Sequence, residues 1–415
     1  MKNYLIIGNG VAAAGCIEGI RSADKDAKIT VVSAETHPVY CRPLISYYLE
    51  GKTTLDKMNY RADNFYEENS CNIIYGKQVT KLDSENKTAI LDDGTEINYD
   101  SVCIATGSSP FVPPFAGLET VQDKFSFMTI DDTLALEKAI DKNSRVLIVG
   151  AGLIGLKCAE GIAEKVKEIT VCDLADRILS SILDNECASI MQSHLENHGI
   201  KFMLGDSVDT FNGKTATMKS GASVSFDVLV LAVGVRANIS ILKDIGGETN
   251  RGIIVNDKME TSLKDIYAAG DCTEGNDISL GQKRVLAILP NAYMQGKCAG
   301  TNMADGASVF DNAIPMNSIG FFGLHAMTAG SYFTQAEGGE LYEEKDQKSI
   351  KRLYMKDGYL TGFIIIGNVE RTGIYTSLIR EKTPLKEVDM ELLKKTPTLA
   401  MFFPETCSKK LKGVI

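Results

Sequence analysis

Two stretches of the chain share one pattern of apolar and polar residues. In each, a short apolar run leads into a cluster of glycines, small and apolar residues follow, and a second apolar run ends near an acidic residue. Short apolar runs predict buried parallel strands, and the longer stretch between them predicts a helix. The pattern therefore predicts two strand–turn–helix–strand units, in residues 4–35 and 145–173.

The first unit has Gly8 and Gly10 at its strand–helix turn. Glycines there permit a tight turn and a close approach of the backbone to a pyrophosphate, which the helix N-terminus also attracts. Glu35, 25 residues after Gly10, can accept hydrogen bonds from ribose hydroxyls. The unit predicts a nucleotide site, and the alternative is an ordinary glycine turn in a doubly wound sheet. The residues that begin the predicted helix are Val11, Ala13 and Ala14.

The second unit has all three glycines of the dinucleotide pattern, Gly150, Gly152 and Gly155, with Leu153 and Ile154 between them. Its second strand ends at Asp173, 21 residues after Gly152. An acid at this place suits the free 2′-hydroxyl of NAD and repels a 2′-phosphate. We therefore expect NADH to be preferred, while the nearby Arg177 leaves NADPH open.

Two dinucleotide sites in one chain predict two redox rings brought together, and the natural pair is a flavin and a nicotinamide. The alternative is a duplicated domain in which one site has degenerated. Degeneration would have altered one glycine cluster, and the only departure is Ala13 at the place of the third glycine.

Composition narrows the possible functions. The chain has 415 residues, 37 of them glycine, and a formal net charge of −10, which argues against nucleic acid or an anionic membrane as a partner. No apolar run reaches the roughly 18 residues of a membrane span, and the first strand leaves no room for a signal peptide, so we expect a cytoplasmic protein. The ten cysteines and four histidines show no metal-ligand spacing, so we expect reduced thiols and no metal.

Four further motifs follow in order: Ala105-Thr106-Gly107, Gly234-Val235-Arg236-Ala237-Asn238, Gly270-Asp271, and the segment from Asn291 to Gln295. With the two glycine clusters, they make the chain resemble the two-dinucleotide-binding flavoprotein reductases of the pyridine nucleotide–disulfide oxidoreductase superfamily. The resemblance implies an FAD site built from Gly8, Gly10, Val11, Ala13, Ala14, Glu35, Arg42, Val79, Ala105, Thr106, Gly107, Gly270, Asp271, Asn291 and Gln295. It implies a nicotinamide site built from Gly150, Gly152, Leu153, Ile154, Gly155, Asp173, Gly234 and Val235.

Within the superfamily, residues 40–46 (YCRPLIS) resemble a segment of the rubredoxin reductases and of the flavin portion of nitrite reductases, and later segments fit related NADH oxidases. The resemblance places Arg42 near the flavin and the pyrophosphate, and the backbone of Val79 at the adenine. The chain lacks the cysteine spacing of the iron–sulfur and sirohaem domains, so we do not expect it to reduce nitrite alone.

We expect an α/β fold with two Rossmann-like domains and a C-terminal α+β interface domain. The resemblance divides the chain into an FAD-binding domain (1–112 and 246–308), an NAD(P)H-binding domain (113–245), an interface domain (309–382) and a tail (383–415). In relatives the interface domain usually mediates homodimerisation or covers the flavin. The tail contains a short apolar block at residues 397–404, which must be buried somewhere. It packs either on its own body or into a partner subunit.

Two side chains, those of Lys157 and Cys41, are candidates for a role in the chemistry. Lys157 stands where the family has a glutamate near the nicotinamide and flavin, and a cation there would favour an anionic reduced flavin. The alternative is that Lys157 faces solvent or pairs with Glu160. Cys41 lies near the position of the redox cysteine of related reductases, but the family cysteine aligns with Pro43 and no CxxxxC pair exists. We therefore expect Cys41 to be an incidental thiol.

The sequence thus predicts an FAD-dependent NAD(P)H oxidoreductase that transfers hydride between NADH and FAD. Electrons would be exchanged with a redox protein such as rubredoxin, ferredoxin or a partner oxidoreductase subunit, so the chain could belong to a larger complex. The alternatives are an NADH oxidase that reduces oxygen, a disulfide or persulfide reductase that uses Cys41, and a flavin-bearing NADH sensor or scaffold.

Overall fold

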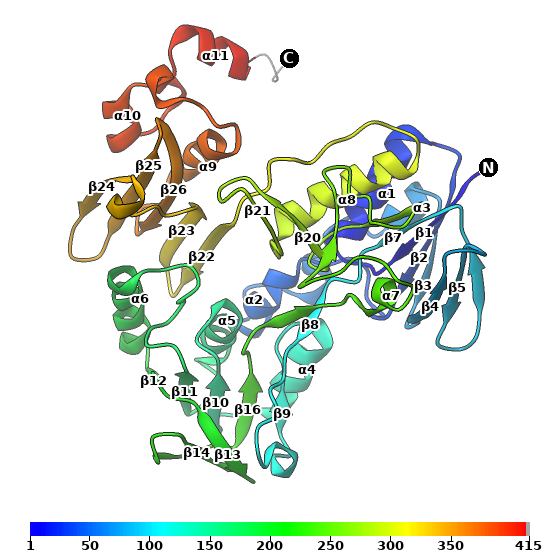
Figure 1. Ribbon diagram of the computed structural model, residues 1–415. Coiled ribbons are helices and arrows are strands. Elements are labelled where there is room, and N and C mark those ends of the chain that lie inside the picture. The colour runs from blue at the N-terminus through cyan, green and yellow to red at the C-terminus, as the bar shows by residue number, and fades with distance from the viewer. Residues whose placement is uncertain (412–415) are drawn as a thin grey trace. The chain divides into compact units, whose positions relative to one another are not determined.

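The computed structural model describes residues 1–411, which form two compact units (Figure 1). The N-terminal unit comprises Met1–Ser180, Glu196–Asn276 and Lys283–Asp311. The C-terminal unit comprises Ser181–Leu195, Asp277–Gln282 and the chain from Asn312 onward. The segment Ser181–Leu195 therefore packs with the C-terminal unit, although the sequence places it within the predicted NAD(P)H-binding domain.

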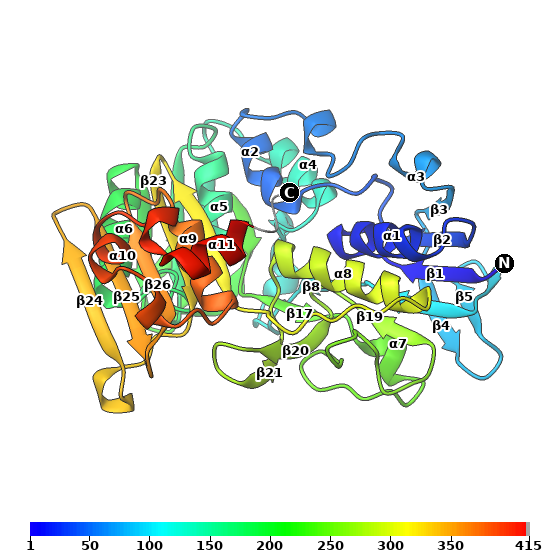
Figure 2. The ribbon, with the colours of Figure 1, turned by 90° about the horizontal axis from the view of Figure 1, so that it is seen from above.

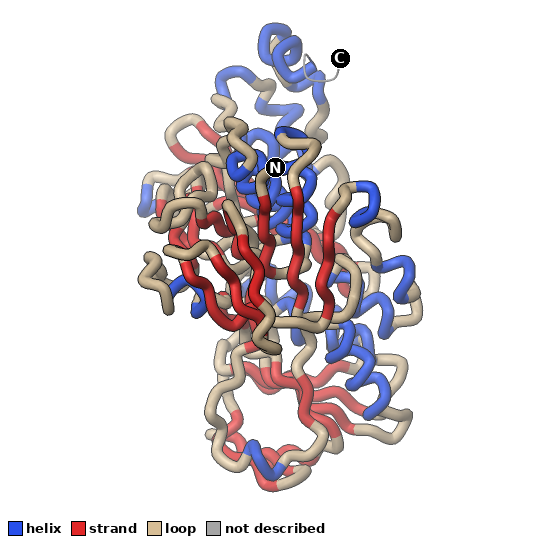
Figure 3. The backbone as a smooth tube through the Cα atoms, turned by 90° about the vertical axis from the view of Figure 1, so that its right-hand side faces the viewer, coloured by secondary structure: helices blue, strands red, loops and turns tan. Residues whose placement is uncertain are grey.

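The N-terminal unit contains the same sheet arrangement twice. One five-stranded parallel sheet has the order β19-β7-β1-β2-β3, and the other has the order β12-β11-β10-β16-β9. Their red strands can be followed in Figure 3. The strands of the first sheet are β1 (Asn3–Ile7), β2 (Lys28–Ser33), β3 (Cys71–Tyr75), β7 (Ser101–Ile104) and β19 (Ile266–Ala268). Those of the second are β9 (Lys124–Phe125), β10 (Arg145–Val149), β11 (Glu168–Asp173), β12 (Ile200–Leu204) and β16 (Val228–Leu231).

Each parallel sheet is accompanied by a three-stranded antiparallel sheet. The first consists of β4 (Val79–Asp83), β5 (Thr88–Leu91) and β6 (Glu96–Asn98), and the second of β13 (Val208–Asn212), β14 (Thr215–Met218) and β15 (Ser223–Ser225). The chain crosses between the two halves of this unit at a ribbon in which β8 (Ser108–Pro110) pairs antiparallel with β17 (Val235–Ala237). This duplication confirms the two predicted Rossmann-like folds.

The helices of the N-terminal unit include α1 (Val11–Ala23) and α5 (Leu153–Ile162), each of which begins directly after a glycine turn. The others are α2 (Ile45–Leu49), α3 (Phe65–Glu68), α4 (Ile130–Ala139), α7 (Ser240–Lys243) and α8 (Leu289–Met303). The short strands β18 (Ile253–Ile254), β20 (Thr273–Asp277) and β21 (Gln282–Arg284) precede α8.

Helices α1 and α8 lie side by side in backbone contact (Figure 2). A methyl group on Gly296 would lie 1.9 Å from the carbonyl oxygen of Ala12, and one on Gly300 would lie 2.0 Å from that of Cys16. Gly15 and Gly19 of α1 approach α8 in the same way. Only glycine permits this approach, so the pair forms a closely fitted element beside the first sheet.

The C-terminal unit is built on an antiparallel sheet with the order β22-β23-β26-β25-β24. The Asp357-Gly358 turn joins β25 and β26, as the alternating sequence predicts. The strands are β22 (Met316–Phe321), β23 (Leu324–Gly330), β24 (Glu340–Lys345), β25 (Ile350–Lys356) and β26 (Tyr359–Ile366), and the helices are α6 (Asn185–Asn197), whose last two residues belong to the N-terminal unit, α9 (Thr372–Arg380), α10 (Met390–Lys395) and α11 (Pro404–Leu411).

The tail contributes to the core of this unit. Leu393, Met401 and Phe402 are buried against Leu353 and Phe363 of the sheet. Of the two fates predicted for the apolar block, the structure therefore shows packing on its own body.

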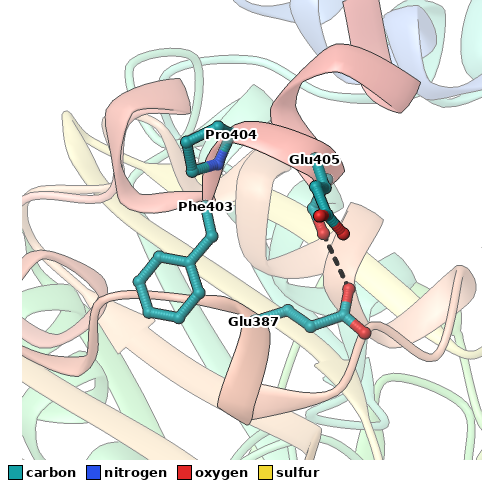
Figure 4. A pocket seen from close by; sticks show the side chains of 5 residues that line it. Glu387, Phe403, Pro404 and Glu405 are labelled. Carbon is teal, nitrogen blue, oxygen red and sulfur yellow. Dashed lines mark hydrogen bonds between the residues drawn. The ribbon is translucent and has the colours of Figure 1, made fainter.

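A hollow in the tail is lined by Glu387, Phe403, Pro404, Glu405 and Thr406 (Figure 4). Thr406 donates a hydrogen bond to the Glu387 carboxylate (2.7 Å), and the Phe403 side chain beside it is half exposed.

Buried charge holds the C-terminal unit together at one further place. The Arg352 guanidinium on β25 is almost inaccessible and forms ion pairs with Asp184, Glu186 and Glu343. Asp184 also accepts a hydrogen bond from the Cys187 amide (2.9 Å) at the start of α6. Arg352 therefore fixes this helix on the antiparallel sheet.

Candidate functional site

The two glycine turns have nearly the same geometry. Gly8 and Gly150 both have positive φ angles, +109° and +118°, and a methyl group on either would lie 2.2 Å from a carbonyl oxygen, that of Ala105 or that of Ala232. Their amides donate to the equivalent carbonyl oxygens, those of Val32 and Cys172, each at 2.8 Å. The turns are therefore equivalent features of the two sheets, and only glycine fits at these two positions.

Gly10 and Gly152 follow in extended conformation and precede α1 and α5. Apart from the glycine itself and its two chain neighbours, no atom of the described chain lies within 4 Å of the methyl position of either glycine. The backbone therefore leaves open space at each helix N-terminus, as a pyrophosphate bound there requires. Both turns pass this steric test for a dinucleotide.

The third position of the glycine pattern differs between the turns. A methyl group on Gly155 would lie 2.0 Å from the carbonyl oxygen of Gly150, so a side chain cannot fit there. The equivalent Ala13 is fully buried in the first half, so the methyl group fits there. Val11 and Ala14 begin α1, and Leu153 and Ile154 begin α5, as predicted.

The acids that follow the turns differ in their surroundings. Glu35 lies just beyond β2, where it pairs with Arg42 and accepts a hydrogen bond from the Tyr40 hydroxyl (2.7 Å). Asp173, the last residue of β11, accepts hydrogen bonds from the amides of Ala151 (2.7 Å) and Ala175 (2.8 Å). Asp173 therefore fixes the second glycine turn as well as standing where the sequence predicts ribose recognition.

Arg42 and Asp271 form the charged part of the predicted flavin site. Burial raises the pKa of the Asp271 carboxyl group, and the nearby Arg42 opposes that rise. Gly270, with a φ of +85°, forms the turn before Asp271. The site thus combines a buried acid and a guanidinium, which fits a ligand with both hydroxyl and phosphate groups.

Gln295 and Asn291 lie on buried positions near the start of α8. The Gln295 side-chain oxygen accepts hydrogen bonds from the Gly270 amide (2.9 Å) and the Thr273 hydroxyl (3.2 Å). The side-chain oxygen of Gln295 therefore stabilises the turn at Gly270. Val79 is the buried first residue of β4, where it pairs with Leu91.

The crossing ribbon brings two further motifs together. The Asn238 side chain donates to the Thr106 carbonyl oxygen (2.9 Å) and accepts from the Ser109 hydroxyl (2.8 Å). Gly107 and Gly234, both with positive φ, flank this ribbon, and Val235 pairs with Pro110 within it. Asn238 is not among the predicted site residues, although it ends the motif Gly234-Val235-Arg236-Ala237-Asn238.

Lys157 lies in α5 and is largely buried. Its ammonium group pairs with Glu160, lies 4.0 Å from the Glu50 carboxylate and sits 4.8 Å from the centre of the Tyr47 ring. Pairing with Glu160 was one of the predicted alternatives. Glu50 also pairs with Lys52, so the structure places two cations and two carboxylates where α2 packs on α5.

Cys41 is half-buried just before Arg42, and burial raises the pKa of its thiol. All ten cysteines are free thiols, and Cys103, Cys158 and Cys172 are buried. Since a raised pKa disfavours the reactive thiolate, this environment does not activate Cys41.

Comparisons with known proteins agree with this geometry. Residues 2–296 match the model of the family described as pyridine nucleotide-disulphide oxidoreductase. The chain belongs to this family. The resemblance read from the motifs is thereby confirmed, and the oxidoreductase is FAD-dependent and uses a nicotinamide dinucleotide as predicted.

Two relatives match this oxidoreductase over nearly their whole length. The NADH-dependent phenylglyoxylate dehydrogenase subunit epsilon of Aromatoleum evansii is 32% identical over 391 residues, with 92% of each chain covered. The NADH oxidase of Methanocaldococcus jannaschii is also 32% identical, with 99% of each chain covered. The fold matches that of the water-forming NADH oxidase of Lactobacillus brevis, with a TM-score of 0.86, 19% identity and full coverage of both chains.

Where the structure describes the chain, in residues 1–411, no helix is both long and apolar enough to cross a membrane.

Proposed function

We propose that the chain is the NADH-linked flavoprotein subunit of a larger oxidoreductase and exchanges electrons between NADH and a partner redox protein. The observation that carries this proposal is the repeated glycine turn, with matching backbone geometry and open space at both helix N-termini of one compact unit. Two such turns support the binding of two dinucleotides in one enzyme, which hydride transfer between them requires.

We place FAD at the first turn, with Glu35 at the adenosine ribose and Arg42 near the pyrophosphate, and NADH at the second turn, with Asp173 at its ribose. When bound, the flavin accepts a hydride from the nicotinamide and passes electrons on singly or in pairs. The residues of the chain bind and orient the two dinucleotides, and no side chain has to act as a general acid or base in the hydride step. The FAD-binding domain is assigned to 1–112 and 246–308, the NADH-binding domain to 113–245 and the interface domain, a candidate for homodimerisation, to 309–382, except that Ser181–Leu195 and Asp277–Gln282 pack with the C-terminal unit.

Two observations favour a protein partner over oxygen or a disulfide as the electron acceptor. The relative from Aromatoleum evansii is named as a subunit and matches the present chain over 92% of both lengths. The environment of Cys41 favours a protonated, unreactive thiol, which weakens the routes that use a redox cysteine.

Direct reduction of oxygen is the second candidate function, because the relative from Methanocaldococcus jannaschii is named as an NADH oxidase. Stopped-flow reoxidation separates the two. The reduced enzyme is mixed with air-saturated buffer, and in parallel with oxidised rubredoxin or ferredoxin under argon. Slow reaction with oxygen and fast reaction with the iron–sulfur protein support the proposal, whereas fast reaction with oxygen alone supports an oxidase. A stable NADH–flavin complex without turnover would indicate a sensor.

A further inference from the structure

The segment that holds the predicted ribose carboxylate also contacts the start of α4. The Arg42 guanidinium donates to the carbonyl oxygen of Met128 (3.1 Å), and the His37 ring lies 2.9 Å from the Asp131 carboxylate. The Ile130 amide donates to the Tyr40 hydroxyl (3.3 Å). Helix α4 follows β9, which pairs with β16 in the second parallel sheet. These contacts therefore join the first glycine-turn half of the unit to the second.

The start of α4 is fixed by its own side chains. The Thr129 hydroxyl accepts from the Asp132 amide (3.0 Å), while the Asp132 carboxylate accepts from the amides of Thr129 (3.1 Å) and Met128 (3.0 Å). This capping box engages three amides but does not reach that of Ile130, the first residue of α4. Tyr40 supplies an acceptor for the Ile130 amide from elsewhere in the fold.

The Tyr40 hydroxyl uses its full hydrogen-bonding capacity. It donates to Glu35 (2.7 Å) and accepts from Arg42 (3.1 Å) and from the Ile130 amide (3.3 Å). A hydroxyl has one proton and two lone pairs, so with two N–H donors on the lone pairs its proton must point to Glu35. The Tyr40 side chain is 6% exposed, and water does not replace these partners readily.

We infer that Tyr40 is a positioning residue that links FAD binding to the placement of α4. It orients the Glu35 carboxylate and the Arg42 guanidinium toward the flavin dinucleotide, and the same hydroxyl anchors the Ile130 amide. This inference rests on the proposed placement of the FAD ribose at Glu35. FAD bound to Glu35 would immobilise the carboxylate that accepts from Tyr40, and so would steady the Tyr40 hydroxyl and the first turn of α4 that donates to it.

The test uses Tyr40→Phe, which keeps the ring and removes the hydroxyl. Tyr99→Phe is the matched control, because Tyr99 is also buried and its hydroxyl only meets the carbonyl oxygen of Asp83 (3.4 Å). FAD binding to the full-length apoprotein is measured by quenching of flavin fluorescence. The proteins compared are Tyr40→Phe, Tyr99→Phe, Glu35→Gln and the double variant that combines Tyr40→Phe with Glu35→Gln. We expect about tenfold weaker FAD binding for Tyr40→Phe and little change for Tyr99→Phe. The double variant should lose less affinity than the product of the two single losses.

Hydrogen exchange of the Ile130 amide supplies a readout that does not depend on activity. We expect FAD to raise its protection in the wild-type protein and in Tyr99→Phe, but not in Tyr40→Phe. Multiplicative losses of affinity, or equal FAD-induced protection in Tyr40→Phe and wild type, would overturn the role of Tyr40. If Glu35→Gln alone leaves FAD binding unchanged, the proposed placement of the ribose fails instead.

Discussion

Gly150 faces the carbonyl oxygen of Ala232 so closely that a methyl group would approach it to 2.2 Å. Two residues later, Gly152 has open space at its methyl position. The fold therefore requires a glycine at position 150, whereas the space beside Gly152 is open to a ligand. This difference makes the two positions a matched pair for experiment.

We expect Gly150→Ala to lower the free energy of unfolding by about 2 kcal/mol or more, because the methyl group meets backbone and φ is +118°. Gly152→Ala should leave stability within about 0.5 kcal/mol and raise the KM for NADH, because its methyl group enters the space for the pyrophosphate. Thermal unfolding and steady-state kinetics measure both effects. A destabilised Gly152→Ala protein with unchanged KM would contradict this assignment.

Asp173 offers a test of dinucleotide preference. Asp173→Asn keeps an oxygen for only one of the two amides, that of Ala151 or that of Ala175, and removes the charge that repels a 2′-phosphate. We expect the ratio of kcat/KM for NADPH to that for NADH to rise about tenfold, which corresponds to ~1.4 kcal/mol. Asp176→Asn, which alters an exposed acid paired with Arg177, is the control. If the ratio of kcat/KM values is unchanged in Asp173→Asn, Asp173 does not take part in recognising the ribose.

Lys157 neutralises two carboxylates whose side chains are 9% exposed or less. Lys157→Met should lower the free energy of unfolding by about 3 kcal/mol, because the buried Glu160 loses its ion pair with Lys157. Lys165→Met, which breaks a more exposed pair with Glu137, should cost at most about 1 kcal/mol. Adding Glu160→Leu to Lys157→Met should restore most of the loss in thermal unfolding.

The same Lys157→Met protein tests a role in the chemistry. If the ammonium group acts on the flavin, removing it lowers the reduction potential of the flavin, because the reduced anion loses a favourable charge. The potential is measured by dye equilibration in Lys157→Met and in Lys165→Met. If the reduction potential of the flavin stays at the wild-type value in Lys157→Met as well as in Lys165→Met, the role of Lys157 is structural only.

The pair Arg145–Asp227 predicts a pH dependence of stability. Hydrogen bonds from the Arg145 side chain and amide hold the pKa of Asp227 well below its ordinary value of about 3.9. A depressed pKa in the folded state adds stability that is fully present above pH ~4 and is lost as the pH falls below it. Asp227→Asn should therefore cost about 1 kcal/mol in urea unfolding at pH 7, and less at pH 3. A difference that does not vary with pH would show that Asp227 does not act through its charge.

The tail supplies a pair of close neighbours with opposite exposure. Met401 is fully buried and Phe403 is 50% exposed. Met401→Ala should cost about 3 kcal/mol, whereas Phe403→Ala should change stability by about 0.5 kcal/mol or less. Thermal unfolding measures both. If Phe403→Ala instead lowers the rate of electron exchange with a partner protein, the exposed ring belongs to a docking surface.

The glycine turns, their strands and the helices that follow could be predicted because their signals are local in the sequence. The contacts that organise the site are not local. Ninety residues separate Tyr40 from Ile130, and 168 separate Arg352 from Asp184. Such pairs depend on which surfaces the two sheets and their helices present to one another, and no single spacing encodes that. Gln295 shows the same limit, since its motif predicts proximity to the flavin but not its bond to the Gly270 amide.

The backbone contact between α1 and α8 has a consequence for which flavin the enzyme accepts. In the proposed arrangement, α1 begins at the pyrophosphate, and the predicted FAD residues Asn291 and Gln295 place the start of α8 beside the flavin. Because Gly296 and Gly300 lock the two helices together, the distance between these two ends is fixed by the fold. The helix pair would then set the span from phosphate to flavin ring, which FAD and FMN share, so the preference for FAD over FMN would rest on the adenosine ribose at Glu35.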